Sequence, residues 1–226
     1  MKLLEQFSYR SNQVWRPQAT ILTEESLNLW GVCFSWGEME LSEKIIENVR
    51  FFVDACHNQS EITNPFGYEV CLSGLENALR SGYALANDVI YRLVNKGSIT
   101  GGAECAFVAK RGQEVAIAQV GQPHVFLKRR GQVLPLSTTV DLLPSDFLSG
   151  SYLPSRLLGL HDRCYPHLQS FQYEKGDELI FLAHSFVPTA VLQSTRSNPK
   201  IELKALYQQI AKEMPQCPFW ISTIKL

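Results

Sequence analysis

The sequence has 226 residues, of which 45% are hydrophobic and 19% are charged, and its formal net charge at pH 7 is −1. This composition is typical of a globular chain with its own core, and the near-neutral charge disfavours nucleic acid, whose partners need a concentrated basic face. No apolar run has the length of a signal peptide or of the roughly 20 residues of a membrane span, so we expect a cytoplasmic protein without a membrane partner.

The first half of the chain contains one predicted strand and two predicted helices. Residues 28–34 form a short apolar run of the strand type. Residues 43–56 carry apolar side chains at helical spacing and charged side chains on the other face, which predicts an amphipathic helix. The same spacing from Val70 to Val94 predicts a second helix of about 37 Å at 1.5 Å rise per residue.

From residue 101 onward the period changes to that of strands. Two hairpins are predicted, and we expect them to follow one another as an antiparallel meander. The later segments predict two more strands, two helices and a final strand. The hairpins comprise residues 105–110 with 114–120 and 125–129 with 132–136; the later segments are 168–173, 178–183, 187–193, 201–214 and 219–225.

Together these elements predict one α+β domain over residues 1–226, with helices on the outer faces of antiparallel sheets. No linker rich in Pro, Gly and Ser divides the chain. Six cysteines occur without a CxxC pair, so we interpret them as reduced and mostly buried thiols. The basic run from Lys128 to Arg130, followed by Gly131, is typical of a solvated hairpin tip.

Several segments, in chain order, carry a family pattern. Residues 84–90 (ALANDVI) are similar to A-N-x-x-I. Residues 101–136 are similar to a GTT turn followed by A-N-V-G-D-S-R-x-Y-L and x-L-T, residues 154–160 (PSRLLGL) to x-x-x-A-L-G, and residues 173–186 (YEKGDELIFLAHSF) to L-x-x-G-D-x-L-L-L-C-S-D-G-L. These motifs resemble those of the type 2C (PPM, metal-dependent) protein phosphatases, and the resemblance covers most of the chain.

The resemblance implies a sandwich of two antiparallel β-sheets flanked by α-helices. It also implies chemistry at a binuclear Mn²⁺ or Mg²⁺ site. Aspartates hold such a site because hard divalent cations prefer anionic oxygen ligands and two adjacent cations need several negative charges. The metals then supply a hydroxide nucleophile and hold the phosphate oxygens.

The acidic positions of this pattern are substituted here. Val14 stands for the acid of R-x-N-Q-D, Phe34-Ser35 for the Asp-Gly of V-x-D-G-M-G, Gln122 for the aspartate of G-D-S-R, and Ser185 for that of S-D-G. The terminal D-N-x-T is absent, with residues 217–220 (CPFW) in its place. We therefore predict a bacterial-type pseudophosphatase with no catalytic residues, no metal and no cofactor.

The predicted binding surface is the former active-site face, which is neutral and partly apolar and suits a protein partner or an uncharged ligand. Its residues are Phe34, Ser35, Trp36, Gln122, His124, His184 and Ser185. The sequence leaves the oligomeric state open. Trp30 and Trp36 are interpreted as core or rim aromatics, with a role in partner binding as the alternative.

Two other functions remain open. One is a divergent metal-dependent serine/threonine phosphatase or other hydrolase with relocated ligands, drawn from His124 and His184 with Glu38 or Glu104, or from the H-x-x-C-x-x-H of His161, Cys164 and His167. The other is a structural subunit that assembles with copies of itself through a sheet edge or an apolar face.

Overall fold

Strands are the main regular elements of the computed structural model, which describes residues 1–11, 15–38, 40–58, 64–137, 154, 156–185, 187–192 and 202–226. The chain divides into two compact units, each built from separate segments of sequence. Unit 1 comprises Met1–Arg16, Gln122–Ser155 and Glu174–Leu226, and unit 2 comprises Pro17–Gly121 and Arg156–Tyr173. Each unit contains one antiparallel five-stranded sheet. The α+β class is thereby confirmed, whereas a single domain over residues 1–226 stays a prediction.

The sheet of unit 2 has the order β2-β3-β4-β5-β8. Its strands are β2 (Ala19–Glu24), β3 (Leu29–Trp36), β4 (Gly102–Arg111), β5 (Glu114–Val120) and β8 (His167–Gln172). The predicted strand at residues 28–34 is therefore confirmed as β3, which is buried along its whole length because it lies inside the sheet. Strand β2 was not predicted.

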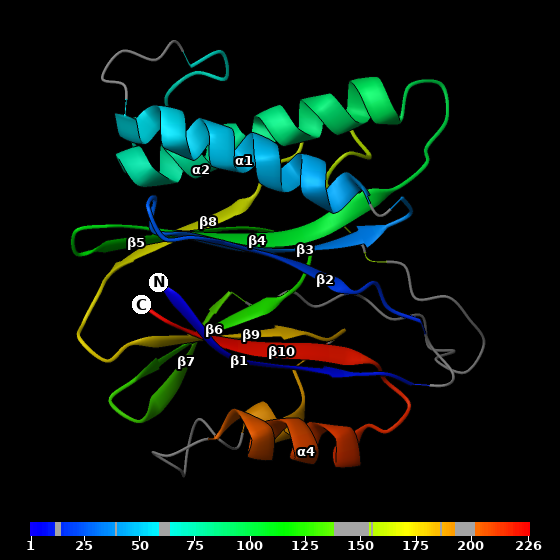
Figure 1. Ribbon diagram of the computed structural model, residues 1–226, viewed down its shortest axis with the longest axis vertical. Helices are drawn as coiled ribbons and strands as arrows, with labels where there is room; N and C mark the ends of the chain where they lie inside the picture. The colour runs from blue at the N-terminus through cyan, green and yellow to red at the C-terminus, as the bar shows by residue number, and fades with distance from the viewer. Residues whose placement is uncertain are drawn as a thin grey trace. The chain divides into compact units, whose positions relative to one another are not determined.

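Two helices cover one face of this sheet (Figure 1). They are α1 (Glu40–Asn58) and α2 (Gly74–Val89), which continues into a π-helical turn η1 (Ile90–Val94). Their apolar faces bury a core against the strands, in which the ring of Tyr83 meets Phe107 edge to face at 5.6 Å. A Cβ at Gly82 would lie 3.1 Å from the Cα of Val49, so glycine lets the two helices approach closely.

The second predicted helix begins four residues later than expected. Ser73 caps α2, since its side chain accepts a hydrogen bond from the Glu76 amide while the Glu76 carboxylate accepts one from the Ser73 amide. This capping box fixes the start of the helix, and Val70 lies outside it with 91% of its surface exposed. Gly74 is therefore the first helical residue, where it does not have the cost of an interior glycine.

The sheet of unit 1 has the order β1-β10-β9-β6-β7, with helix α4 on one face (Figure 1). Its elements are β1 (Lys2–Tyr9), β6 (His124–Arg129), β7 (Gln132–Ser137), β9 (Glu178–Ala183), α4 (Leu203–Glu213) and β10 (Phe219–Lys225). The first and last strands pair, so Lys2 lies opposite Lys225. Strand β1 was not predicted. Of the predicted helix at 187–193, residues 189–192 are helical and residue 193 lies outside the described residues.

The predicted meander is wrong, because the two hairpins belong to different sheets. Strand β5 pairs with β4 and β8, whereas β6 pairs with β7 and β9. The chain leaves the sheet of unit 2 at Gly121, which has a φ of +66°. A Cβ there would lie 2.7 Å from the Cγ of Glu104 and 2.8 Å from the carbonyl oxygen of Arg156. Only glycine fits this position, and the strand alternation on its two sides gave no sign of the break.

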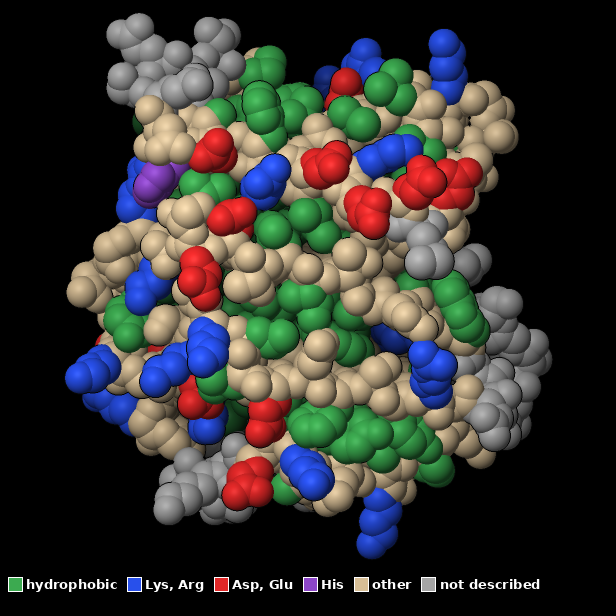
Figure 2. Space-filling view, in the orientation of Figure 1, with side chains coloured by type: hydrophobic (Ala, Val, Ile, Leu, Met, Phe, Trp, Pro, Cys, Tyr) green, Lys and Arg blue, Asp and Glu red, His purple; other side chains and the backbone are tan. Residues whose placement is uncertain are grey.

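All six cysteines are free, and Cys33, Cys105 and Cys217 are buried. Burial raises the pKa of the Cys33 thiol well above its ordinary value, with its neighbour Cys105 adding to the effect. Such thiols stay protonated and behave as small apolar side chains. Within the described ranges, no helix combines the length and the apolar character needed to cross a membrane. Figure 2 shows acidic and basic side chains interspersed along the surface of α1.

Candidate functional site

The seven residues of the predicted binding face are divided between the two units. Phe34, Ser35 and Trp36 end strand β3 of unit 2. The other four, Gln122, His124, His184 and Ser185, lie in unit 1 just before or at the start of β6 and just after β9.

The unit 2 residues surround a buried carboxylate. Phe34 is fully buried and lies opposite Glu104 on β4. The indole Nε1 of Trp36 donates a hydrogen bond of 3.0 Å to Oε2 of Glu104, which is itself fully buried. The hydroxyls of Ser35 and Ser42 are 2.5 Å apart. At this end of β3, Phe34 therefore provides only hydrocarbon, and the polar groups of Ser35 and Trp36 have hydrogen-bond partners.

Both tryptophans lie in the interior, since Trp30 is fully buried and Trp36 is 8% exposed. The interpretation of these residues as core aromatics is confirmed. The N–H of Trp36 also stabilises the Glu104 carboxylate, which burial alone would destabilise. This pairing could not be predicted, since the two residues are 68 positions apart in the chain.

The unit 1 residues form a second buried polar group. The Oε1 of Gln122 accepts a short hydrogen bond from Nη2 of Arg16. Nε2 of His124 lies 2.8 Å from the carbonyl oxygen of His184, so this nitrogen carries the proton and donates it. The His184 ring packs on Phe219 with a centroid distance of 6.1 Å. Gln122, His124 and His184 are buried, and Ser185 is half-buried.

Arg16 is a residue that the sequence analysis did not single out. It lies in the segment before β2, where neither a motif nor a period marks it, and it meets Gln122 only through the fold of unit 1. Its guanidinium brings a fixed positive charge to the glutamine that stands for the G-D-S-R aspartate. The substituted Val14 lies outside the described residues.

The alternative metal sites are not assembled among the residues that the structure describes, which contain no group of three or more His, Cys, Asp or Glu side chains placed to hold a metal ion. In the H-x-x-C-x-x-H segment, His161 and His167 are exposed, and burial raises the pKa of Cys164 to about 12. A thiol with that pKa is protonated at neutral pH. Glu38 is exposed on the chain before α1.

No protein-family model matches the sequence, and no curated protein matches it either. Solved structures do match over nearly the whole chain. One is described as "PppA, a key regulatory component of T6SS in Pseudomonas aeruginosa", with a TM-score of 0.62 and 15% identity over 97% of this chain and 95% of that one. A second is the PPM Ser-Thr phosphatase MsPP from Mycobacterium smegmatis in complex with cacodylate, with a TM-score of 0.62 and 14% identity over 98% and 97%.

A third match is the catalytic domain of the serine threonine protein phosphatase PstP in complex with two manganese ions, with a TM-score of 0.57 and 15% identity over 98% of this chain and 97% of that one. The chain has the fold of the PPM serine/threonine phosphatases. The resemblance found in the sequence motifs is confirmed at the level of the fold.

Two motifs that the chain shares with the PPM pattern lie against each other in unit 2. Asn87, from A-N-x-x-I, accepts a hydrogen bond of 2.8 Å from the Gly159 amide and donates one of 3.0 Å to the His161 carbonyl. Gly159, from the A-L-G motif, has a φ of +94°, and a Cβ there would lie 2.3 Å from Ile90. These PPM motifs therefore hold the 156–161 segment against α2.

Asn95 completes the same attachment. Its side-chain amide donates to the carbonyls of Gly101 and Gly159 at 2.8 and 2.7 Å, and its oxygen accepts from the Thr100 amide at 2.8 Å. Asn95 is only 8% exposed, and its bond to the Gly159 carbonyl is buried, whereas its bonds to Gly101 and Thr100 are partly buried. The sequence analysis missed this residue because no PPM motif marks it.

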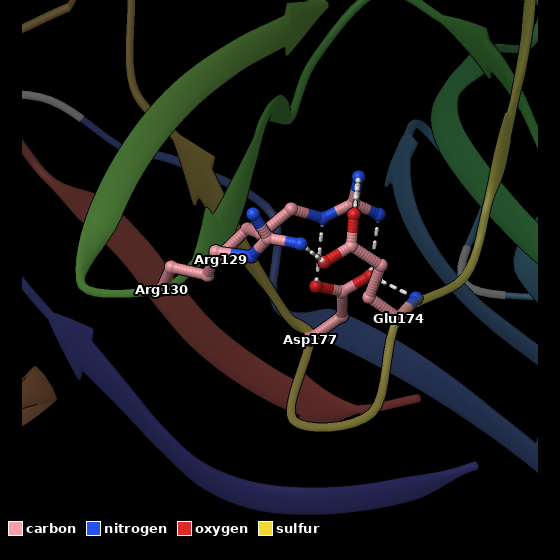
Figure 3. A network of polar contacts seen from close by, with 4 residues as sticks. All are labelled: Arg129, Arg130, Glu174 and Asp177. Atoms are coloured by element: carbon pink, nitrogen blue, oxygen red, sulfur yellow. Dashed lines mark hydrogen bonds and ion pairs between the residues drawn. The ribbon is translucent and has the colours of Figure 1, made fainter.

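The G-D motif of unit 1 forms an ion-pair network with the β6–β7 hairpin (Figure 3). Arg129 binds Asp177 through two hydrogen bonds, Nε to Oδ1 at 2.9 Å and Nη2 to Oδ2 at 2.7 Å. Glu174 pairs with Arg129 at 3.1 Å and with Arg130 at 2.6 Å, and its amide donates to Asp177 at 2.8 Å. The hairpin tip is confirmed, but its basic residues are paired and do not form a free patch.

Asp177 is 1% exposed, so its carboxylate depends on this network. Burial would raise its pKa. The hydrogen bonds from Arg129 and from the Glu174 amide, with the charges of Arg129 and Arg130, lower the pKa more than burial raises it, and the pKa ends below its ordinary value. The contacts with Arg129, Arg130 and the Glu174 amide therefore keep the aspartate of this PPM motif ionised.

Proposed function

We propose that this PPM-fold chain does not hydrolyse phosphate esters and acts as a binding or regulatory module. The observation that carries the proposal is the pair formed by Gln122 and Arg16. Gln122 stands where the motif resemblance places a metal-binding aspartate. A neutral amide is a weak ligand for Mn²⁺ or Mg²⁺, and a guanidinium beside it repels a divalent cation.

The other substituted positions support the same proposal. Phe34 offers hydrocarbon where an aspartate is expected, and Ser185 offers a neutral hydroxyl. Two adjacent divalent cations need several carboxylates to offset their mutual repulsion, and the donor set at these positions does not fit that requirement.

The seven residues of the predicted face, taken within each unit by itself, remain our candidates for partner binding, and their burial limits what a partner can contact. Of these seven, Ser185 has a half-buried side chain and the other six are buried. A partner would therefore meet the backbone and the rim around them more than the side chains themselves. A regulatory role is in keeping with PppA, a similar structure described as a key regulatory component of T6SS.

Titration calorimetry of the metal-stripped protein with Mn²⁺, followed by p-nitrophenyl phosphate hydrolysis in the same buffer, tests the proposal. We expect no saturable binding in the micromolar range and no metal-dependent turnover. Micromolar binding with turnover that depends on the metal would overturn the proposal. The variants Glu104→Gln, His124→Gln and His184→Gln would then identify whether relocated ligands carry that activity.

A further inference from the structure

Unit 1 contains a groove of about 610 Å³ at the start of α4. This volume lies within the range of sites that bind small ligands or a few side chains. Leu4, Ile180 and Leu203 supply apolar lining from β1, β9 and the first residue of α4. Leu4 lies at the irregularity in the β1 pairing and is 42% exposed, so its side chain is available to a ligand.

The strand register explains why the groove exists on this face. Thr223 lies opposite Glu5 on one side and opposite Ile180 on the other, so these three side chains point to the same face of the sheet. Ile221, two residues away on β10, belongs to the core that α4 covers. The sheet therefore extends past the start of α4 on the face that the helix covers.

The charges around the groove are not balanced. Lys128 and Glu178 neutralise each other at 2.9 Å. Of the other charged lining residues, Glu5 and Glu202 are acidic and Lys204 is basic. None of these three forms an ion pair within the described part of the chain, so the groove has an excess of one negative charge. In Figure 2, hydrophobic side chains and charges of both signs lie close together above α4.

Thr223 adds an unsatisfied hydrogen-bonding group to the lining. It is 7% exposed, and its hydroxyl has no hydrogen-bond partner in the described ranges. Because Glu5 lies directly opposite, a donor that pairs with the Glu5 carboxylate approaches this hydroxyl as well. Buried hydroxyls are normally hydrogen-bonded, so the groove is incomplete without a polar partner.

We propose that this groove binds a single lysine or arginine side chain of a partner protein, with an adjacent apolar side chain against Leu4, Ile180 and Leu203. Glu5 and Glu202 provide the carboxylates for the cation, and the excess of one negative charge matches one positive charge. The inference rests on the proposed binding role and names the chemistry of the partner. It uses residues of unit 1 alone.

The probe is the peptide acetyl-Val-Leu-Arg-Leu-Val-amide, with the glutamate peptide acetyl-Val-Leu-Glu-Leu-Val-amide as its opposite. Amide resonances of the ¹⁵N-labelled full chain report the binding site. We expect the arginine peptide to shift the resonances of Glu5, Leu203 and Thr223, and the glutamate peptide to leave them in place. Equal shifts with both peptides, or none with either at millimolar concentration, would overturn the proposal.

Charge variants separate specific binding from general attraction. Glu5→Gln with Glu202→Gln should weaken the arginine peptide about tenfold, since both carboxylates that pair with the cation are removed. Glu43→Gln with Glu47→Gln removes the same charge from exposed positions of α1 and should leave the affinity unchanged. Lys204→Glu should tighten binding about threefold. An equal loss in both double variants would show attraction by net charge alone and sink the proposal.

The same samples keep this inference distinct from the proposed loss of hydrolysis. Turnover of p-nitrophenyl phosphate with Mn²⁺ would contradict the proposed function and leave a peptide shift at Glu5 and Thr223 intact. If the peptide does not bind and no turnover is seen, the proposed groove site is wrong, while the proposed loss of hydrolysis at the substituted metal positions stands.

Discussion

The motif positions that match the PPM pattern and those that depart from it differ in what their side chains hold. Asn87 and Asp177 match the pattern, and each binds a backbone segment or a hairpin that comes from a distant part of the chain. Phe34, Gln122 and Ser185 depart from it, and none of them carries a charge. The matching residues serve the fold, and the departures fall on the carboxylates that metal chemistry would need.

Polar groups at and beside the substituted positions have hydrogen-bond partners. Gln122 has a hydrogen bond from Arg16, and Trp36 binds the buried Glu104. A PPM-type fold can form without carboxylates at these positions if other partners satisfy the buried polar groups. If this is right, variants at matching positions should cost much more stability than variants at the substituted ones.

The largest effect is expected at Asn95, which no PPM motif marks but which binds the same Gly159 segment as the matching residue Asn87. Asn95→Ala leaves the buried carbonyl of Gly159 and the partly buried carbonyl of Gly101 and amide of Thr100 without their partners. We expect the free energy of unfolding to fall by about 3 kcal/mol, the sum of several unsatisfied groups. Urea denaturation followed by circular dichroism measures it.

Asn48→Ala is the matched control for Asn95. Asn48 donates one hydrogen bond of 2.7 Å to the Lys44 carbonyl within α1 and is half-buried. Its replacement should change the free energy of unfolding by less than about 0.5 kcal/mol. Similar losses for the two variants would mean that the hydrogen bonds around Gly159 have no special importance.

Asp177→Asn should lower the free energy of unfolding by about 2 kcal/mol near neutral pH, because it removes a charged partner from Arg129. The pKa of Asp177 lies below its ordinary value in the folded state. Its contribution is therefore complete above the unfolded pKa of about 4 and is lost as the pH falls through the folded value. Urea unfolding of both proteins between about pH 7 and pH 2 should show their difference shrinking below about pH 4.

Asp162→Asn is the control for this pH dependence. Asp162 is exposed and has no ion pair within the described residues. Its replacement should leave both the stability and its pH profile close to those of the unchanged chain. A constant difference between the Asp177→Asn variant and the unchanged protein down to pH 2 would contradict the structural role of the carboxylate.

The sequence predicted the elements with strong periods and missed what long-range contacts decide. The last strand, Phe219–Lys225, agrees with its prediction residue for residue, because aromatic and β-branched residues with a high strand propensity make up most of it. The two hairpins lie in different sheets, and no period marks Gly121, the positive-φ residue at which the chain leaves the first sheet. The edge strands β1 and β2 were missed because their half-exposed faces carry a weak apolar signal.

The candidate site shows the same contrast between what a local pattern predicts and what long-range contacts decide. The substituted positions could be found by alignment to the motif pattern, since they lie inside recognisable segments. Their new partners could not be found, because Arg16 is 106 residues from Gln122 and Trp36 is 68 residues from Glu104. The neutral and apolar composition of the seven proposed face residues also could not predict that six of them are buried.

A smaller effect is expected at Trp36. Trp36→Phe keeps an aromatic ring and removes the N–H that Glu104 accepts, so the buried carboxylate loses a donor. We expect a loss of about 1 to 2 kcal/mol in the free energy of unfolding. Trp15→Phe, at a position that is 66% exposed, serves as the control. Adding Glu104→Met, which removes the acceptor, to Trp36→Phe should cost less than the sum of the single variants, and simple additivity would contradict the pairing.

The smallest effect is expected at Ser185, which is half-buried and stands for the S-D-G aspartate. Ser185→Asp should change the free energy of unfolding by less than about 0.5 kcal/mol, as for most surface substitutions. It should also produce no micromolar Mn²⁺ binding by calorimetry, because one carboxylate cannot offset two divalent cations while Phe34 and the Gln122–Arg16 pair remain. Ser185→Ala controls for the lost hydroxyl. Strong Mn²⁺ binding by Ser185→Asp alone would mean that the remaining ligands are already in place. Ser185 would then be the one substituted position that prevents metal binding, and the contrast with the matching positions would not extend to Phe34 and Gln122.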